Sequence, residues 1–339
     1  MNLAPVSVVI PAYNSARTLG ETLESILSQT FVPRQIIVID DGSKDATGEV
    51  AQSFGGQITY RLQENAGPSA ARNHGLRLAA EPWIAFLDAD DVWHPRKIEL
   101  QMRCLEAHPE LGLLATDNFD WPVSRFPEIA APAAMTMTPV TWEQLVIRTL
   151  ILTSTVMVKR EVMQKVGEFD ASLCGPEDRD MFLRIAKITP MGMMNTALTG
   201  YRDTAGSLTK QASQCEAGMR RILSRIDAAG EWKNRPALRN KAYSFMHYRC
   251  ATAQARAGNH AGAVWRGIKS LLRYPLPYKK DEVRMAFDRP KRLAVNVLRL
   301  LKIKGPDTAP PALQASDRSA FDQWKQTAAQ GSQTQVAPA

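Results

Sequence analysis

The alternation of strand-like and helix-like segments over the first 107 residues constrains the fold of this chain more than any other feature. Short apolar runs predict strands over residues 6–10, 35–39, 58–62 and 83–87. Segments with helical spacing of their apolar residues follow at 16–28, 45–54, 69–80 and 95–107. Strands and helices that alternate in this way form parallel βαβ units. We therefore predict an α/β fold with an open, Rossmann-like, mostly parallel sheet flanked by helices.

The rest of the chain continues this pattern and then changes to helices alone. Strands are predicted at 111–120, 153–158 and 197–202, helices at 141–149, 161–166 and 180–187, and a loop at 124–137. Beyond residue 211, helices are predicted at 218–228, 236–257, 261–274 and 283–303. The last residues are rich in Pro, Ala, Gln and Ser, a composition typical of disorder. We predict an α/β domain at 1–210, a basic helical C-terminal region at 211–304 and a disordered tail at 305–339.

The charges are divided unequally along the chain. Residues 1–200 contain 17 Lys and Arg against 24 Asp and Glu, whereas residues 201–339 contain 25 against 10. An acidic first part is suited to holding a cation, and a basic second part to meeting anions. The basic amphipathic segment 283–303 predicts either a helix docked on the main domain or peripheral contact with an anionic membrane. Nucleic acid is not an expected partner, because aromatic residues are not interleaved with the basic ones.

Cysteine use and hydropathy predict a cytoplasmic protein. The four cysteines are widely spaced and form no CxxC pair, which argues against a zinc site and against a disulfide framework. No apolar run approaches the ~20 residues that span a bilayer. The apolar stretch at 6–10 is too short for a signal peptide. We therefore expect membrane contact, where it occurs, to be peripheral and at the inner face.

The predicted strands place three polar segments where a ligand would bind. In open α/β sheets, ligands bind outside the carboxyl ends of the strands, and here those ends are followed by residues 11–14, 40–43 and 88–91. Neither a GxGxxG nor a Walker pattern is present. Two of the three segments are acidic instead. Carboxylates in these places predict contacts to a base or ribose, and a divalent cation between the protein and phosphates.

Asp88 and Asp90 carry the metal hypothesis. Carboxylates two residues apart in an extended segment point the same way, and they repel each other unless a cation or protons intervene. Mg²⁺ or Mn²⁺ prefers such oxygen ligands and bridges carboxylates to a diphosphate. The alternative is an acidic turn that caps the helix beginning near Pro95.

Several segments together resemble the family 2 glycosyltransferases, which have the GT-A fold. The resemblance rests on the segments 6–14, 25–30, 39–43, 65–68, 71–73 and 86–91. These lie in the family's order, and the match extends over about residues 5–205. It implies an inverting enzyme that takes a sugar from a nucleoside-diphosphate donor, with UDP as the expected nucleotide.

The resemblance also implies roles for individual residues on the donor side. Pro11, Ala12 and Tyr13 would line the nucleobase pocket, and Asp41 would accept a hydrogen bond from the base, with Asp40 as the alternative. Arg72 would approach the base or the diphosphate. Asp88 and Ala89 would contact the donor, with Asp88 reaching ribose or metal, and Asp90 would be the main metal ligand.

A second acidic segment supplies the expected base. By the resemblance, Asp178 is the general base that removes the proton of an acceptor hydroxyl, with Glu177 as the alternative or a helper. The structural alternative is charge at a helix N-terminus, which contributes ~0.3–1 kcal/mol. One departure concerns Thr204, which stands where the family often has a histidine near the metal. A third ligand would then come from water, Asp91 or Asp203.

The expected function is transfer of a sugar to a hydroxyl acceptor, a glycan or glycolipid, in surface polysaccharide or glycolipid synthesis. Two other functions compete with it. A non-catalytic nucleotide-sugar-binding or scaffold protein of the same fold would bind the donor without turnover. A sugar-1-phosphate nucleotidylyltransferase would need a Gly-rich phosphate loop, which residues 11–15 lack.

Overall fold

A nine-stranded sheet forms the centre of the first two thirds of the chain, counted over the residues that the computed structural model describes. These are residues 2–123, 126–127, 129, 136–173, 175–202, 212–278, 288–301 and 303. The strands are β1 (Asn2–Ala12), β2 (Phe31–Asp40), β3 (Thr59–Leu62), β4 (Trp83–Phe86), β5 (Val92–Trp93), β6 (Leu113–Trp121), β7 (Met137–Val140), β8 (Met157–Lys159) and β9 (Met191–Arg202). Their order is β3-β2-β1-β4-β8-β6-β9-β5, and β7 pairs with β9.

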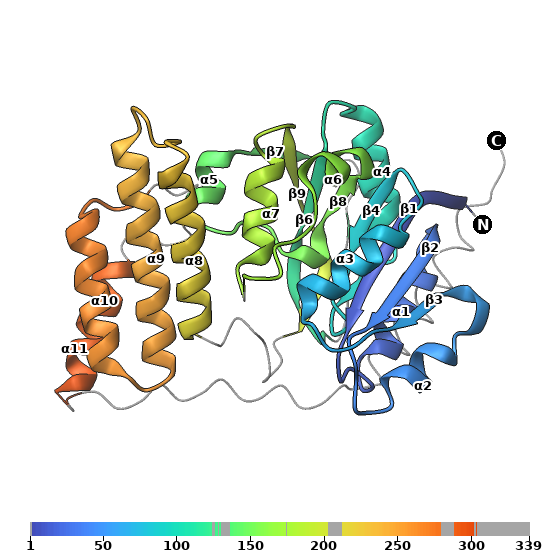
Figure 1. Cartoon of the computed structure of the whole chain (residues 1–339), viewed down its shortest axis with the longest axis horizontal. Helices are drawn as coiled ribbons and strands as arrows, with labels where there is room; N and C mark the ends of the chain where they lie inside the picture. Colours follow the sequence, from blue (N-terminus) through green and yellow to red (C-terminus); the bar gives the residue numbers. More distant parts are fainter. Residues whose placement is uncertain are drawn as a thin grey trace.

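Helices cover the sheet and form the rest of the described chain (Figure 1). Those of the first part are α1 (Leu19–Leu27), α2 (Thr47–Gln52), α3 (Pro68–Leu78), α4 (Lys97–Ala107), α5 (Trp142–Ile147), α6 (Arg160–Val166) and α7 (Glu177–Ile185). Two 3₁₀ turns occupy Gly55–Gln57 and Thr153–Thr155. The later helices are α8 (Ala212–Ala228), α9 (Pro236–Arg256), α10 (His260–Arg273) and α11 (Asp288–Leu300).

The predicted fold class is confirmed, and the sheet is parallel over its first half only. Strands β3, β2, β1 and β4 are parallel neighbours. Beyond β4 the sheet is mixed, because β8 pairs antiparallel with both β4 and β6, while β6 and β9 are parallel. The three-residue strand β8 follows a 3₁₀ turn in a region where a single strand at 153–158 was predicted. A run this short carries no periodicity that could reveal its direction.

Other boundaries also differ from the predictions. Strands β5 and β7 were not predicted, and β9 begins at Met191 rather than at residue 197. Helix α7 begins at Glu177 rather than at residue 180, because the acidic residues of its first turn favour the helix N-terminus. The predicted boundary at residue 210 and the tail at 305–339 lie outside the described residues.

The alternating side chains of β1 face two separate cores. Val8 and Ile10 pack with α1 and α4 on one face of the sheet, through residues such as Leu23 and Ile98. Val9 lies in the other core, which continues through α7 into α8 and α9. Helices α8 and α9 therefore pack against α5 and α7 with a shared apolar core, as their neighbouring positions in Figure 1 indicate. No described helix is long and apolar enough to cross a membrane.

Gly75 is the point where α3 lies closest to the sheet. A Cβ added at Gly75 would come within 2.3 Å of Val9 Cγ1, in the centre of the sheet. We predict that Gly75→Ala lowers the free energy of unfolding by about 1–3 kcal/mol through overpacking, although alanine favours an isolated helix. Urea denaturation measures this. Gly56→Ala is the control, because an added Cβ there meets nothing within 4 Å, and equal stability of the two variants would contradict the prediction.

Candidate active site

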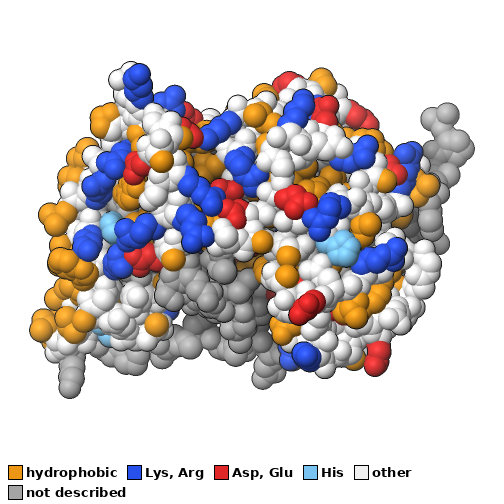
Figure 2. Space-filling view, in the orientation of Figure 1, with side chains coloured by type: hydrophobic (Ala, Val, Ile, Leu, Met, Phe, Trp, Pro, Cys, Tyr) orange, Lys and Arg blue, Asp and Glu red, His pale blue; other side chains and the backbone are white. Residues whose placement is uncertain are grey.

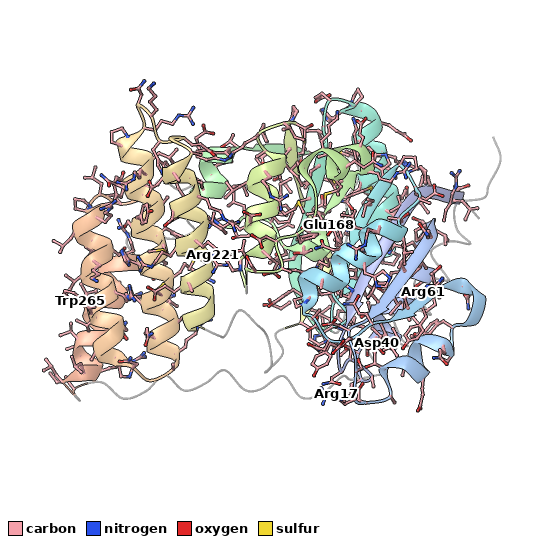
Figure 3. All side chains as sticks on the ribbon, viewed as in Figure 1. Arg17, Asp40, Arg61, Glu168, Arg221 and Trp265 are labelled. Atoms are coloured by element: carbon pink, nitrogen blue, oxygen red, sulfur yellow. The ribbon has the colours of Figure 1, made fainter. Side chains whose placement is uncertain are left out.

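The carboxyl ends of β1, β2 and β4 place the three polar segments at one edge of the sheet. Ala12 and Asp40 are register partners at the ends of β1 and β2, and the Asp41 amide donates to the Ala12 carbonyl at 2.8 Å. After β4, the Leu87 amide donates to the Val9 carbonyl at 3.0 Å, so the acidic turn that follows lies beside the end of β1. Figure 3 shows Asp40 at this edge.

Pro11, Ala12 and Tyr13 lead from β1 into the site. Ala12 is buried, whereas Tyr13 is half exposed, with 50% of its surface open to solvent. The next residue, Asn14, ties this segment to the loop after β2: its amide donates to Ser43 Oγ at 2.9 Å, and its Oδ1 accepts from the Lys44 amide at 2.8 Å. The half-exposed ring of Tyr13 therefore lies next to a backbone segment that hydrogen bonds of Asn14 hold in place.

The Asp40 side chain is buried and hydrogen-bonded to nearby protein groups. Its Oδ1 accepts a hydrogen bond from the Ser43 amide at 2.9 Å, and its Oδ2 accepts one from the Tyr60 hydroxyl at 2.9 Å. Burial, with the Asp40 carboxylate, raises the pKa of Tyr60 to about 12. The phenol is therefore a fixed donor, and Asp40 closes the turn after β2.

The Asp41 carboxylate organises the segment that leads into α3. It accepts hydrogen bonds from Gln63 Nε2 at 2.7 Å, from the Ala66 amide at 2.9 Å and from the Gly67 amide at 2.8 Å. Asp41 is buried, like Asp40, and the two carboxylates have different partners, as adjacent residues at a strand end should. Through Gly67, Asp41 fixes the start of the helix that carries Arg72.

The acidic turn after β4 is held by its backbone. The Asp91 amide donates to the Asp88 carbonyl at 3.0 Å, which closes the turn. The Thr22 hydroxyl on α1 lies 3.0 Å from the carbonyl oxygen of Ala89 and 2.8 Å from that of Asp91. On the other side, the Asp88 amide donates to Ser154 Oγ at 3.1 Å. These contacts fix the backbone and leave the Asp88 and Asp90 side chains half-buried at the edge of the site.

Asp91, one of the expected sources of a third metal ligand, turns inward. Its Oδ1 accepts a hydrogen bond from the Arg202 amide at 3.0 Å, and its side chain is buried. Burial raises its pKa well above the usual value for a carboxyl, and the neighbouring charges of Asp90 and Asp88 add to this. Arg202 completes the arrangement, because its Nε donates to the Asp90 carbonyl at 2.9 Å and its guanidinium pairs with Glu21 on α1.

Arg72 joins the acidic turn after β4 to the second acidic segment. Its Nη2 lies 2.6 Å from Asp88 Oδ1, its Nη1 lies 3.1 Å from Glu177 Oε1, and its guanidinium lies 5.7 Å from the centre of the Phe169 ring. Only 5% of Arg72 is exposed. Burial by itself lowers the pKa of the guanidinium, and the charges of Asp88 and Glu177 reverse this, so that the pKa lies above its ordinary value.

Glu177 and Asp178 stand in different surroundings at the start of α7. Glu177 binds Arg72 through Oε1 and accepts the Gly175 amide through Oε2 at 3.0 Å. Asp178 instead accepts the Arg179 amide at 2.6 Å. Burial raises the pKa of Asp178 to about 7, and the Glu177 charge contributes. Two adjacent carboxylates are thus separated into one paired anion and one that holds a proton near neutral pH.

The charges at the site make a cation a good fit at the acidic turn. Arg72 compensates Asp88 and Glu177, while burial, with a smaller contribution from neighbouring carboxylates, raises the pKa values of Asp91 and Asp178. Asp88 and Asp90 offer the hard oxygen atoms that Mg²⁺ and Mn²⁺ bind. The described residues contain no group of three or more His, Cys, Asp or Glu that could hold a metal by themselves. Thr204 and Asp203 lie outside the described residues.

Sequence reasoning missed the residues that support the acidic turn from behind. These are Thr22, Ser154, Glu21 and Trp93, whose Nε1 donates to the Ser154 carbonyl at 2.8 Å. Behind Trp93 lies Lys97, fully buried, with its Nζ 4.1 Å from the ring centre. Burial lowers the pKa of Lys97 well below the usual value. None of these contacts has a local signal in the sequence.

We predict that Arg72→Met lowers the free energy of unfolding by about 3–5 kcal/mol, because it leaves the buried Glu177 charge without its partner. The control is Arg77→Met on the same helix. Arg77 pairs with Glu168 on the surface, where both side chains are about half exposed, so its loss should cost less than about 1 kcal/mol. Urea denaturation measures the free energy of unfolding of both variants. Similar losses in the two would contradict the prediction.

Comparison with known proteins supports one family. The model of glycosyl transferase family 2 matches residues 7–127. Two proteins described as uncharacterized glycosyltransferases, from Rickettsia prowazekii and Rickettsia typhi, are each 30% identical to the chain; the alignments cover 61% and 62% of this chain and 66% and 69% of those proteins. TuaG of Bacillus subtilis, named for teichuronic acid biosynthesis, is 32% identical over 60% of this chain and 81% of its own length.

Solved structures show the same fold. S. aureus TarS, residues 1–349, was solved in complex with UDP-GlcNAc; it superposes with a TM-score of 0.51 at 16% identity, covering 82% of this chain and 93% of that one. This likeness concerns the fold alone, and it agrees with the predicted GT-A fold. The matched family model, the identity to TuaG and the arrangement of the strand ends agree: the chain belongs to family 2 of the glycosyltransferases.

Proposed function

We propose that this chain transfers a sugar, with inversion, from a nucleoside-diphosphate sugar, preferably a UDP-sugar, to a hydroxyl acceptor. The observation that carries the proposal is the Arg72 bridge. It joins Asp88 of the donor-side turn to Glu177 of the base segment, 89 residues further along the chain. Glu177 is thereby committed to Arg72 and the Gly175 amide. Asp178 is left to act as the base.

The chemistry is a single displacement. An acceptor oxygen forms a bond to the anomeric carbon from the face opposite the diphosphate, while the bond from that carbon to the diphosphate oxygen breaks and its electron pair leaves with the nucleotide. The proton of the acceptor hydroxyl passes to the Asp178 carboxylate, which becomes a neutral acid. The raised pKa of Asp178 suits this step, because a base works best when its pKa lies near the working pH.

The donor contacts follow the edge of the sheet. Tyr13, with Pro11 and Ala12, would form one wall for the base, and Asp41 or Asp40 would accept its hydrogen bond. Both carboxylates already bind protein groups, and each oxygen can accept a further hydrogen bond. Arg72, Asp88 and Ala89 would face the ribose and diphosphate. TarS, which has this fold, was solved with UDP-GlcNAc, and this supports a nucleotide-sugar donor.

We assign the divalent cation, Mg²⁺ or Mn²⁺, to Asp90 and Asp88. When bound, it would offset charge on the departing nucleoside diphosphate. Water and the donor phosphates would complete its coordination, since the Asp91 carboxylate accepts a hydrogen bond from the Arg202 amide. Arg202 and Thr22 hold the backbone of the turn, so that Asp90 keeps its place as the cation enters and leaves.

The acceptor is proposed to be a glycan or glycolipid of a surface polysaccharide, in line with the name of the relative TuaG. We further propose that residues 1–210 form the transferase domain and that residues 211–304 form a helical region of separate role. The protein would work in the cytoplasm, with peripheral contact to the inner face of the membrane through its basic C-terminal helices.

We predict that Asp178→Asn lowers kcat for sugar transfer about 10²–10⁴-fold, because the amide cannot take the acceptor proton. Release of UDP or GDP from a panel of nucleotide-sugars with Mn²⁺, and its loss on adding EDTA, measures the reaction. Binding of the donor by thermal shift should be kept in the variant. Glu168→Gln, a change of an exposed carboxylate, is the control and should match the wild type.

Two results would count against this assignment. Equal rates for wild type and Asp178→Asn would remove Asp178 as the base. Donor binding without turnover by the wild type, across a broad acceptor panel, would favour a non-catalytic protein of the same fold.

We predict that kcat/KM rises with pH up to about 7 and then levels off. The raised pKa of Asp178 means that the base is protonated, and inactive, in acid, so each pH unit below about 7 should cost about tenfold. Glu177 and Asp88 raise this pKa, while Arg72 and the Arg179 amide oppose them. Initial rates of nucleotide release between about pH 5 and 9, with the product quantified directly, test the profile. A rate independent of pH in this interval would exclude Asp178 as the titrating base.

A further inference from the structure

Helix α10 carries an apolar stripe on the side that faces away from the rest of the protein. Trp265, Ile268 and Leu272 follow one another at helical spacing and are exposed, with 56% of Trp265 and 79% of Leu272 open to solvent. Leu276, just after the helix, is also exposed. Figure 3 shows Trp265 at the end of the molecule opposite Asp40. An apolar stripe of this kind is unusual on a surface and marks an interaction site.

The stripe is additional to the contacts that hold α10 in place. The opposite side of the helix already packs on its neighbours, where Ala263 and Ser270 are buried. The Ser244 hydroxyl of α9 donates to the Ser270 carbonyl at 2.7 Å. Gly267 lies against Leu293 of α11, where an added Cβ would come within 3.1 Å of Leu293 Cδ1. The packing of α10 in the bundle therefore gives no reason for the outward residues to be apolar.

Neighbouring side chains are basic and none is acidic on α9 and α10. Helix α9 has four Lys and Arg and α10 has three, and neither contains Asp or Glu. On α10 these are Arg266, Lys269 and Arg273, which helical spacing places along one side of the stripe. Arg266 pairs with Glu216 of α8, and the Arg273 guanidinium lies 5.1 Å from the centre of the Tyr243 ring. Lys269 Nζ lies 4.7 Å from the centre of the Trp265 ring. Figure 2 shows many Lys and Arg side chains over this part of the surface, with apolar side chains at its outer edge.

The end of α11 extends the apolar surface. Leu298 and Leu301 lie three residues apart and are exposed, and Ile303 follows with 70% of its surface open. Helices α10 and α11 are in contact and lie together at one end of the molecule (Figure 1). We call the outward residues Trp265, Ile268, Leu272 and Leu276, with Leu298, Leu301 and Ile303, the α10–α11 surface.

We propose that the α10–α11 surface docks on a membrane that contains anionic phospholipid. Its tryptophan and leucines would enter the boundary between headgroups and acyl chains, and Lys269 would extend to the phosphates. Charge decides between this occupant and a second copy of the chain. Two copies meeting on this surface would bring their basic flanks together, whereas an anionic surface attracts each Lys and Arg.

This proposal rests on the membrane contact of the proposed function and assigns that contact to the α10–α11 surface. The sequence directed attention to residues 283–303, whereas the described surface is carried mainly by α10, with the end of α11 beside it. Sugar transfer does not depend on it, because the active site is built at the other end of the molecule. The two proposals can therefore fail separately.

Co-sedimentation of the full chain with vesicles tests the proposal. The wild type should pellet with vesicles of phosphatidylcholine and phosphatidylglycerol at low salt, and much less with phosphatidylcholine alone. The double variant Trp265→Ala, Leu272→Ala should lower the partition coefficient by about tenfold or more. Lys269→Glu should lower it for anionic vesicles only. Nucleotide release without vesicles should stay unchanged in these variants.

Matched controls use the same changes at other exposed sites. Leu62→Ala with Ile188→Ala removes two exposed aliphatic side chains of the first part, and Lys233→Glu changes the charge at an exposed site of the turn after α8. Both should bind vesicles like the wild type. Equal pelleting of the Trp265 and Leu272 variant would overturn the proposal. So would a dimer, seen by light scattering, that dissociates in this variant while vesicles bind neither protein.

Discussion

The buried guanidinium of Arg72 is the interaction on which the site depends. A cation with 5% exposure requires negative partners, and it finds them in Asp88, on one side, and in Glu177, on the other. Those partners belong to a turn after β4 and to the start of α7, so the pairing holds the two acidic segments together. Of the adjacent carboxylates Glu177 and Asp178, it is Glu177 that forms the ion pair with Arg72. The arrangement of the remaining charges follows, including the raised pKa of Asp178.

The sheet places these groups because of a property that can be read from the sequence. Buried β-branched runs predicted β1 and β2 within a few residues, and the rule that ligands meet strand ends predicted the edge where Asp40 and Asp88 lie. The acidic turn could be predicted because it directly follows a buried strand. Its resemblance to a family added the roles of Arg72 and Asp178, which local patterns alone would have assigned to a helix surface and a helix N-terminus.

The remainder depends on contacts between residues far apart in the sequence. The two-residue strand β5 exists because Val92 pairs with Gly200 across 108 positions, and such a pairing leaves no local periodicity. Thr22 supports the acidic turn from α1, and no motif separates this threonine from any other on a helix. The sequence offers Asp91 as a third ligand, and its contacts with Ser154 and with the Arg202 amide of β9 come from residues far along the chain. Long-range packing therefore decides the functions of side chains that composition leaves equivalent.

Acidic and basic side chains are also concentrated at opposite ends of the molecule. Carboxylates gather at the strand ends, where they are stable only with Arg72, protons or a cation, while α9 and α10 gather Lys and Arg without any acid. Opposite charges at the two ends cannot neutralise each other across this distance, because salt screens them within about 8–10 Å. Some of the basic side chains are paired locally with acids of α8, Arg239 with Asp227 and Arg266 with Glu216. The exposed Trp265 lies beside Lys269, and this pair suits a partner surface that is both anionic and apolar. A membrane with anionic lipids has both properties, whereas a dissolved nucleotide or metal ion does not.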